Sequence, residues 1–240
     1  MIDTQPNQEE QEVKTLEDLL ENAGQLFHLR GMVDKSRKPS ELTSLNEQIT
    51  RILTKDTPGD YLPTLNQVSA NAPWASRYAT AGLSTRLETA KPLYEKYGSR
   101  LKEQIIEAMQ QELKESQSKA DAALRLSTYF TGLAESPELD QVTADEYAQD
   151  ELAKRIGVDV NFTARGHIEA YRKKHENLYA RLFAEQFIKE TKSNGSSKYE
   201  LDTQKIDEVM KDVKAGAVIY TNYRGIQEAK RKTEQETKKK

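Results

Sequence analysis

The sequence contains no cysteine. This absence excludes a disulfide framework, a thiolate nucleophile and any metal site built on cysteine ligands. The chain also lacks a long hydrophobic run, since no stretch approaches the roughly 20 apolar residues that a membrane-spanning helix needs. Its acidic first residues, 1–13, contain no apolar core of a secretory signal. The missing signal favours a cytoplasmic location.

Histidine is scarce, and none of the three histidines belongs to a recognisable metal or catalytic motif. His167 and His175 fall on one predicted helix, but eight residues separate them by about 12 Å, too far to bind one ion together. Glycine-rich phosphate loops, the nucleophile elbow and the His-Glu-x-x-His zinc motif are all absent. We therefore predict a non-enzymatic protein without cofactor or metal. An enzyme of unrecognised type, with His167 and Tyr171 in a pocket, is an alternative.

The composition that is present is polar. Charged residues make up 31% of the chain and hydrophobic residues 36%, and the mean hydropathy is −0.84. These values are polar for a globular protein, although 240 residues suffice for one or two domains with a real core. Such a chain forms a core with long solvated tails, forms an elongated helical body, or completes its core with a partner.

The two ends of the chain carry opposite charge. Seven acidic residues against one lysine give residues 1–22 a net charge of −6, and seven basic against three acidic residues give residues 224–240 a net charge of +4. The whole chain has a net charge of −3, which argues against a generally basic nucleic-acid binder. Charged termini are usually solvated. Alternatively, the acidic and basic ends could attract each other or a partner.

Helical periodicity dominates the sequence and predicts an all-α fold. We expect an irregular multi-helix bundle of about seven to nine helices, compact or elongated, with disordered termini. Pro92 is expected to kink or restart a helix, and residues 193–198 are expected to form a polar loop. The predicted helices cover about residues 15–32, 42–53, 73–92, 99–133 (with an interruption near 116–118 as an option), 143–156, 165–191 and 202–213.

The same pattern predicts the domain organisation. Ser136-Pro137 interrupts the helical pattern, and a full capping box at Thr143–Glu146 starts the next helix. The predicted regions are a disordered acidic tail at 1–13, an N-terminal helical region at 14–135, a linker at 136–142, a C-terminal helical region at 143–223 and a basic charged tail at 224–240.

Residues 151–168, ELAKRIGVDVNFTARGHI, raise the question of a DNA-binding helix-turn-helix. Gly157 suits the turn of such a motif, and Val158 suits the apolar contact that locks its helices. The second half departs from the pattern, because Thr163 and Gly166 fall where apolar anchors belong. A left-handed glycine cap with an accompanying apolar contact explains the same residues, so an ordinary interhelical loop is favoured.

We predict that the protein is an intracellular helical scaffold or adaptor that binds a protein partner. Tyrosine and arginine are enriched at interface hot spots. Tyrosine alternates with arginine or lysine in three short segments, although such aromatic residues often lie in a core. The candidate interaction surface comprises Arg77, Tyr78, Tyr94, Tyr97, Tyr220, Tyr223 and Arg224.

Nucleic-acid binding through residues 151–175 and the basic tail is the main alternative function. Residues 159–175 hold four basic and two acidic residues, a net charge of only +2. A steep salt dependence of DNA or RNA binding would support this function. The candidate nucleic-acid contacts are Arg165, His167, Arg172, Lys173 and Lys174.

Overall fold

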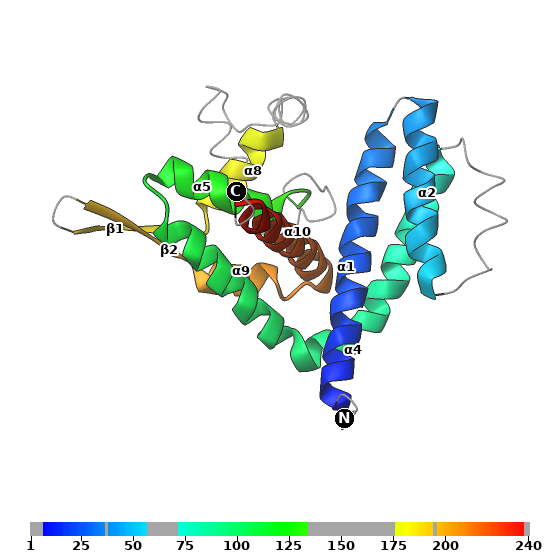
Figure 1. The fold of residues 1–240 in the computed structure, drawn as a ribbon, viewed down its shortest axis with the longest axis horizontal. Helices are drawn as coiled ribbons and strands as arrows, with labels where there is room; N and C mark the ends of the chain where they lie inside the picture. Colours follow the sequence, from blue (N-terminus) through cyan, green and yellow to red (C-terminus); the bar gives the residue numbers. More distant parts are fainter. Residues whose placement is uncertain (1–6, 37, 57–71, 134–175, 194–195, 238–240) are drawn as a thin grey trace, which may run out of the picture. The chain divides into compact units, whose positions relative to one another are not determined.

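The structure is a computed structural model that is predominantly helical, which confirms the predicted all-α class (Figure 1). Its helices are α1 (Gln8–Lys35), α2 (Pro39–Asp56), α4 (Ala72–Lys114), α5 (Lys119–Ser127), α8 (Glu176–Glu185), α9 (Thr203–Val209) and α10 (Val213–Thr237), with a 3-10 turn η1 (Thr128–Phe130) and two strands, β1 (Ile188–Ser193) and β2 (Ser196–Leu201). The structure describes residues 7–36, 38–56, 72–133, 176–193 and 196–237.

The chain divides into two compact units. Unit 1 consists of Met1–Ser99 and Gly216–Thr221, and unit 2 consists of Arg100–Ala215 and Asn222–Lys240. Helices α4 and α10 therefore contribute residues to both units. The predicted linker at 136–142 lies outside the described residues, so the predicted domain limits stay a prediction.

Helix α1 begins at Gln8, inside the region predicted to be a disordered tail. The Asn7 side chain caps the helix by accepting a hydrogen bond from the backbone amide of Glu9 at 3.3 Å. Glu9 and Glu10 lie in the first turn, where the helix dipole favours negative charge. The acidic residues that suggested a solvated tail thus suit a helix start.

Unit 1 has an aliphatic core in which α1, α2 and the first part of α4 meet. Leu16, Leu20 and Leu26 of α1 and Ile49 and Leu53 of α2 are completely buried. Burial of each such side chain contributes about 1.5–3 kcal/mol. The core follows from the amphipathic stripes that the sequence predicted for both helices.

The Gly216–Thr221 segment of α10 packs closely on α1 and α4 within unit 1. A Cβ atom on Gly24 of α1 would lie 2.1 Å from Thr221 Oγ1 and 2.6 Å from the backbone oxygen of Ala217. A Cβ atom on Gly216 would lie 2.4 Å from the Tyr94 hydroxyl. Only glycine permits these approaches, so the C-terminal part of the chain completes the N-terminal unit.

Helix α4 continues through Pro92, so the restart that the sequence predicted as one of two options does not occur, and the kink stays a prediction. Proline removes the hydrogen bond to the carbonyl four residues earlier, on Glu88. Both residues are exposed, so water can satisfy that carbonyl and the helix need not end. The break expected as an option near 116–118 is present, because α4 ends at Lys114 and Ser118 caps α5 by accepting from the Asp121 amide at 3.1 Å.

Unit 2 is built around an aromatic cluster between α5, η1 and α8. The ring centroids of Phe130 and Phe187 lie 4.7 Å apart, and Phe183 lies 5.4 Å from Phe130 and 5.5 Å from Phe187. All three residues are buried. These separations suit favourable aromatic pairs, and residues of the predicted 165–191 helix supply two of the rings.

A β-hairpin replaces the end of the predicted 165–191 helix and the predicted 193–198 loop. Helix α8 ends at Glu185, and β1 pairs antiparallel with β2 from Ile188↔Leu201 to Ser193↔Ser196. Between the strands the sequence reads Asn194-Gly195, a dipeptide that is strongly preferred in two-residue hairpin turns. The strands lack the alternation of apolar and polar residues that predicts a strand, because most hairpin residues are polar and exposed. Of the hairpin side chains that the structure describes, only Ile188 and Leu201, at the base of the hairpin, are buried.

Helix α10 continues to Thr237, through most of the segment predicted to be a charged tail. Every residue from 228 to 237 is exposed, so the helix end is stabilised locally and by one ion pair rather than by a core. Among the described residues, no helix is long and apolar enough to cross a membrane.

Candidate interaction sites

Three side chains at the start of α4 form a cluster that we call the Trp74 patch: the exposed Trp74 and Arg77 and the half-buried Tyr78. Trp74 is the only tryptophan of the chain, and 44% of it is exposed. The Arg77 guanidinium carbon lies 5.2 Å from the indole centroid, and the Tyr78 ring stacks against the indole at 6.3 Å. The spacing of three and four residues places all three side chains on one helix face.

The other tyrosines predicted for the interaction surface occupy different environments. Tyr94 and Tyr220 are buried, with 7% and 2% exposure, so they are core residues and not parts of an exposed surface. In unit 2, Tyr223 and Arg224 are half-buried. The structure therefore brings Arg77 and Tyr78 together, and it adds Trp74, which the prediction omitted although it lies one helical turn away.

Tyr97, the remaining predicted residue, takes part in an ion-pair cluster between α1 and α4. The Lys96 ammonium and the Tyr97 hydroxyl each donate to Glu12 Oε2 at 2.7 Å. Hydrogen bonds from Lys96, Tyr97 and Gln8 lower the pKa of Glu12 to about 2. The pKa of Lys96 is correspondingly raised, chiefly by its hydrogen bond to Glu12.

A groove of about 300 Å³ lies between α1 and α2 in unit 1. Leu29 and Ile52 supply its apolar side chains, and the polar side chains at its edges are those of Gln25, His28, Gln48 and Arg51. Sequence reasoning missed this site because its residues come from two helices whose pairing the pattern did not specify.

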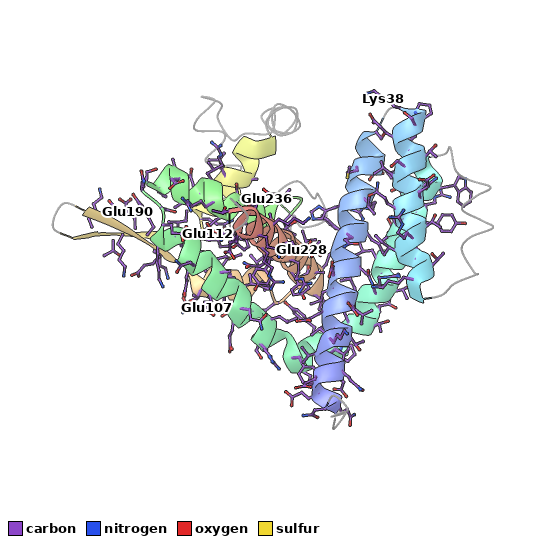
Figure 2. All side chains as sticks on the ribbon, in the orientation of Figure 1. Lys38, Glu107, Glu112, Glu190, Glu228 and Glu236 are labelled. Carbon is purple, nitrogen blue, oxygen red and sulfur yellow. The ribbon has the colours of Figure 1, made fainter. Side chains whose placement is uncertain are left out.

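Unit 2 contains a nearly buried carboxylate, that of Glu112 on α4 (Figure 2). Only 10% of its side chain is exposed, and Lys230 of α10 and Arg125 of α5 each bind one of its oxygens, the latter at 3.3 Å. Arg125 also contacts Glu115 at 3.1 Å and Asp121 at 3.3 Å. Glu112 and Lys230 are 118 residues apart, a separation at which sequence spacing carries no signal.

The buried Tyr129 hydroxyl lies in the same unit and has no hydrogen-bond partner among the described residues. Burial, together with the charge of Glu112, raises the pKa of Tyr129. This hydroxyl therefore stays protonated at neutral pH.

The predicted nucleic-acid contacts Arg165, His167, Arg172, Lys173 and Lys174 all lie outside the described residues, as does the helix-turn-helix question at 151–175. Within the described ranges, no group of three or more His, Asp or Glu side chains is arranged to hold a metal ion.

Comparison of the chain with protein families, with curated proteins and with solved structures finds no match in any of the three.

Proposed function

We propose that this chain is an intracellular, non-enzymatic helical scaffold or adaptor that binds a protein partner through the Trp74 patch. The main support for this proposal is the exposure of Trp74. Tryptophan, tyrosine and arginine are the residues most enriched among interface hot spots, and here all three share one face of α4.

The geometry of the patch suits a contact surface. The Arg77 guanidinium and the Tyr78 ring both lie against the Trp74 indole, so these contacts hold the indole before a partner arrives. Such preorganisation reduces the entropy lost when side chains are fixed on binding. A partner that covers the indole removes a large apolar surface from water, which favours association.

A retention experiment tests the proposal. The immobilised full chain, its Trp74→Ala variant and its Met32→Ala variant are exposed to the same cell extract, and retained proteins are cross-linked and quantified by mass spectrometry. Met32 is a matched control, because it lies in the same unit, is apolar and is 54% exposed. Circular dichroism checks that both variants are folded.

We expect at least one protein to cross-link near residue 74 and to be retained by the unchanged chain and by Met32→Ala. Its purified form should bind Trp74→Ala about 30-fold more weakly, as expected for a hot-spot truncation. Equal affinity for all three chains would contradict the proposed role of the patch.

A further inference from the structure

The groove between α1 and α2 combines an apolar surface with hydrogen-bonding groups. Leu29 on α1 and Ile52 on α2 provide the apolar part. The edges carry the Gln25 and Gln48 amides, the His28 imidazole and the Arg51 guanidinium. A volume of about 300 Å³ lies at the small end of the range for ligand pockets in proteins.

Arg51 is the group that points to a ligand. Its side chain is exposed and, among the residues that the structure describes, it has neither a carboxylate nor a hydrogen-bond partner. Arginine presents a planar fork of donors that suits carboxylate or phosphate oxygens. An arginine at the edge of an apolar groove is therefore suited to an anion that carries an apolar group.

We propose that this groove binds a small amphipathic anion, whose short aliphatic chain lies on Leu29 and Ile52 and whose head group is held by Arg51. This site is separate from the Trp74 patch and does not depend on the proposed function. The Gln25 amide already donates to Glu21 Oε1 at 3.3 Å. The carboxylate of Glu21 therefore directs the anionic head away from α1 and toward Arg51 on α2.

The dimensions of the groove favour a small ligand over a partner helix. Its residues cover only 25–29 of α1 and 48–52 of α2, about 6 Å along each helix axis. An amphipathic partner helix places anchors over about two turns and would need a longer apolar stripe. A short alkyl chain is therefore the apolar group that suits a groove of about 300 Å³.

Titrations followed by amide NMR shifts of the full chain test this site with four probes. Octanoate and octyl phosphate carry both parts of the proposed ligand, octan-1-ol lacks the charge, and acetate lacks the chain. We expect one or both anionic amphiphiles to shift residues 25–29 and 48–52 with a Kd on the order of 1 mM. Whichever of octanoate and octyl phosphate binds more tightly identifies the preferred head group as carboxylate or phosphate.

Arg51→Gln should weaken binding of that probe about tenfold, the loss expected for one charge-assisted hydrogen bond. Lys55→Gln is the control, because Lys55 is an exposed cation one turn further along α2 and outside the groove. Circular dichroism confirms that both variants fold. Equal loss in both variants, equal binding of octan-1-ol or acetate, or no shift with any probe would overturn the proposal. An acidic amphipathic peptide is titrated as a fifth probe, and tighter binding of this peptide would overturn the proposal in favour of a docking surface.

Discussion

At the scale of single residues, the Glu12–Lys96 ion pair has a titration that can be measured. The pKa of Glu12 is lowered from 4.5 to about 2. A carboxyl group with a lowered pKa stabilises the folded state above its unfolded pKa, and it loses that contribution as the pH falls. The contribution of Glu12 is therefore present above about pH 4.5 and lost between about pH 4.5 and pH 2.

We predict that Lys96→Met raises the Glu12 pKa from about 2 toward 4.5, because the hydrogen bond from Lys96 is the largest cause of the shift. Tyr97→Phe should raise it less. The measurement is an NMR pH titration of the Glu12 carboxyl carbon. Lys91→Met, which removes another exposed lysine of α4, should leave the midpoint unchanged. An unchanged midpoint in Lys96→Met would refute the ion pair.

The buried carboxylate of Glu112 gives a second prediction at this scale. Glu112→Gln leaves Lys230 and Arg125 without their shared anion, and removal of one partner of a buried pair costs about 3–5 kcal/mol. The side chains of Lys230 and Arg125 are 47% and 34% exposed. Because solvent can hydrate both cations, Glu112→Gln should lower the free energy of unfolding by only about 1–2 kcal/mol.

Glu115→Gln is the matched control for this variant, because Glu115 also contacts Arg125 but its side chain is 52% exposed. Glu115→Gln should lower the free energy of unfolding by less than about 0.5 kcal/mol. Denaturant unfolding measures both free energies. If Glu112→Gln and Glu115→Gln lower the free energy of unfolding by the same amount, the burial of Glu112 does not make its ion pairs more stabilising.

At the scale of elements, two glycines of α1 test how α10 packs on that helix within unit 1. Gly24→Ala places a Cβ atom against Thr221 and the Ala217 carbonyl, so overpacking should lower the free energy of unfolding by about 1–3 kcal/mol. At Gly31, apart from its chain neighbours and the backbone of its own helix, no described atom lies within 4 Å of the added Cβ. Gly31→Ala should therefore stabilise the protein by about 0.5–1 kcal/mol, because alanine favours a helix over glycine.

Thermal or denaturant unfolding distinguishes the two glycine variants by the sign of the change. A stabilising Gly24→Ala would show that α10 does not pack against α1 in this way. Deletion of residues 213–240 would not serve as well, because the truncated chain also loses the Lys230–Glu112 contact of unit 2.

Elements were predicted from sequence wherever apolar spacing or a cap identified them. Helices α1, α2 and α9 occur where the sequence predicted helices at about 15–32, 42–53 and 202–213, and the Asp202 side chain caps α9. Apolar alternation does not predict the hairpin, because its strands are mostly polar, and the polar residues 193–198 indicate a loop instead. Pro92 did not restart the helix because its exposed site tolerates a missing hydrogen bond. The Glu112 network depends on long-range pairing, which local spacing does not encode.

At the scale of the whole molecule, only part of the predicted interaction surface lies together. Composition identified tyrosine and arginine as candidate contacts, but burial decided which of them reach solvent. Tyr94 and Tyr220 are part of the core of unit 1, while the exposed Arg77 and the half-buried Tyr78 lie against the exposed Trp74. Helical periodicity cannot distinguish a buried tyrosine or arginine from an exposed one, because both side chains have an apolar and a polar part.

The single tryptophan offers the most direct test of the proposed partner binding. The full chain labelled with 5-fluorotryptophan gives one fluorine NMR signal, from Trp74. We predict that a cell extract broadens or shifts this signal, and that Arg77→Ala weakens the effect whereas Met32→Ala preserves it. A signal that is unaffected by the extract, or one that responds in a salt-sensitive way to a DNA duplex instead, would contradict protein binding through the Trp74 patch.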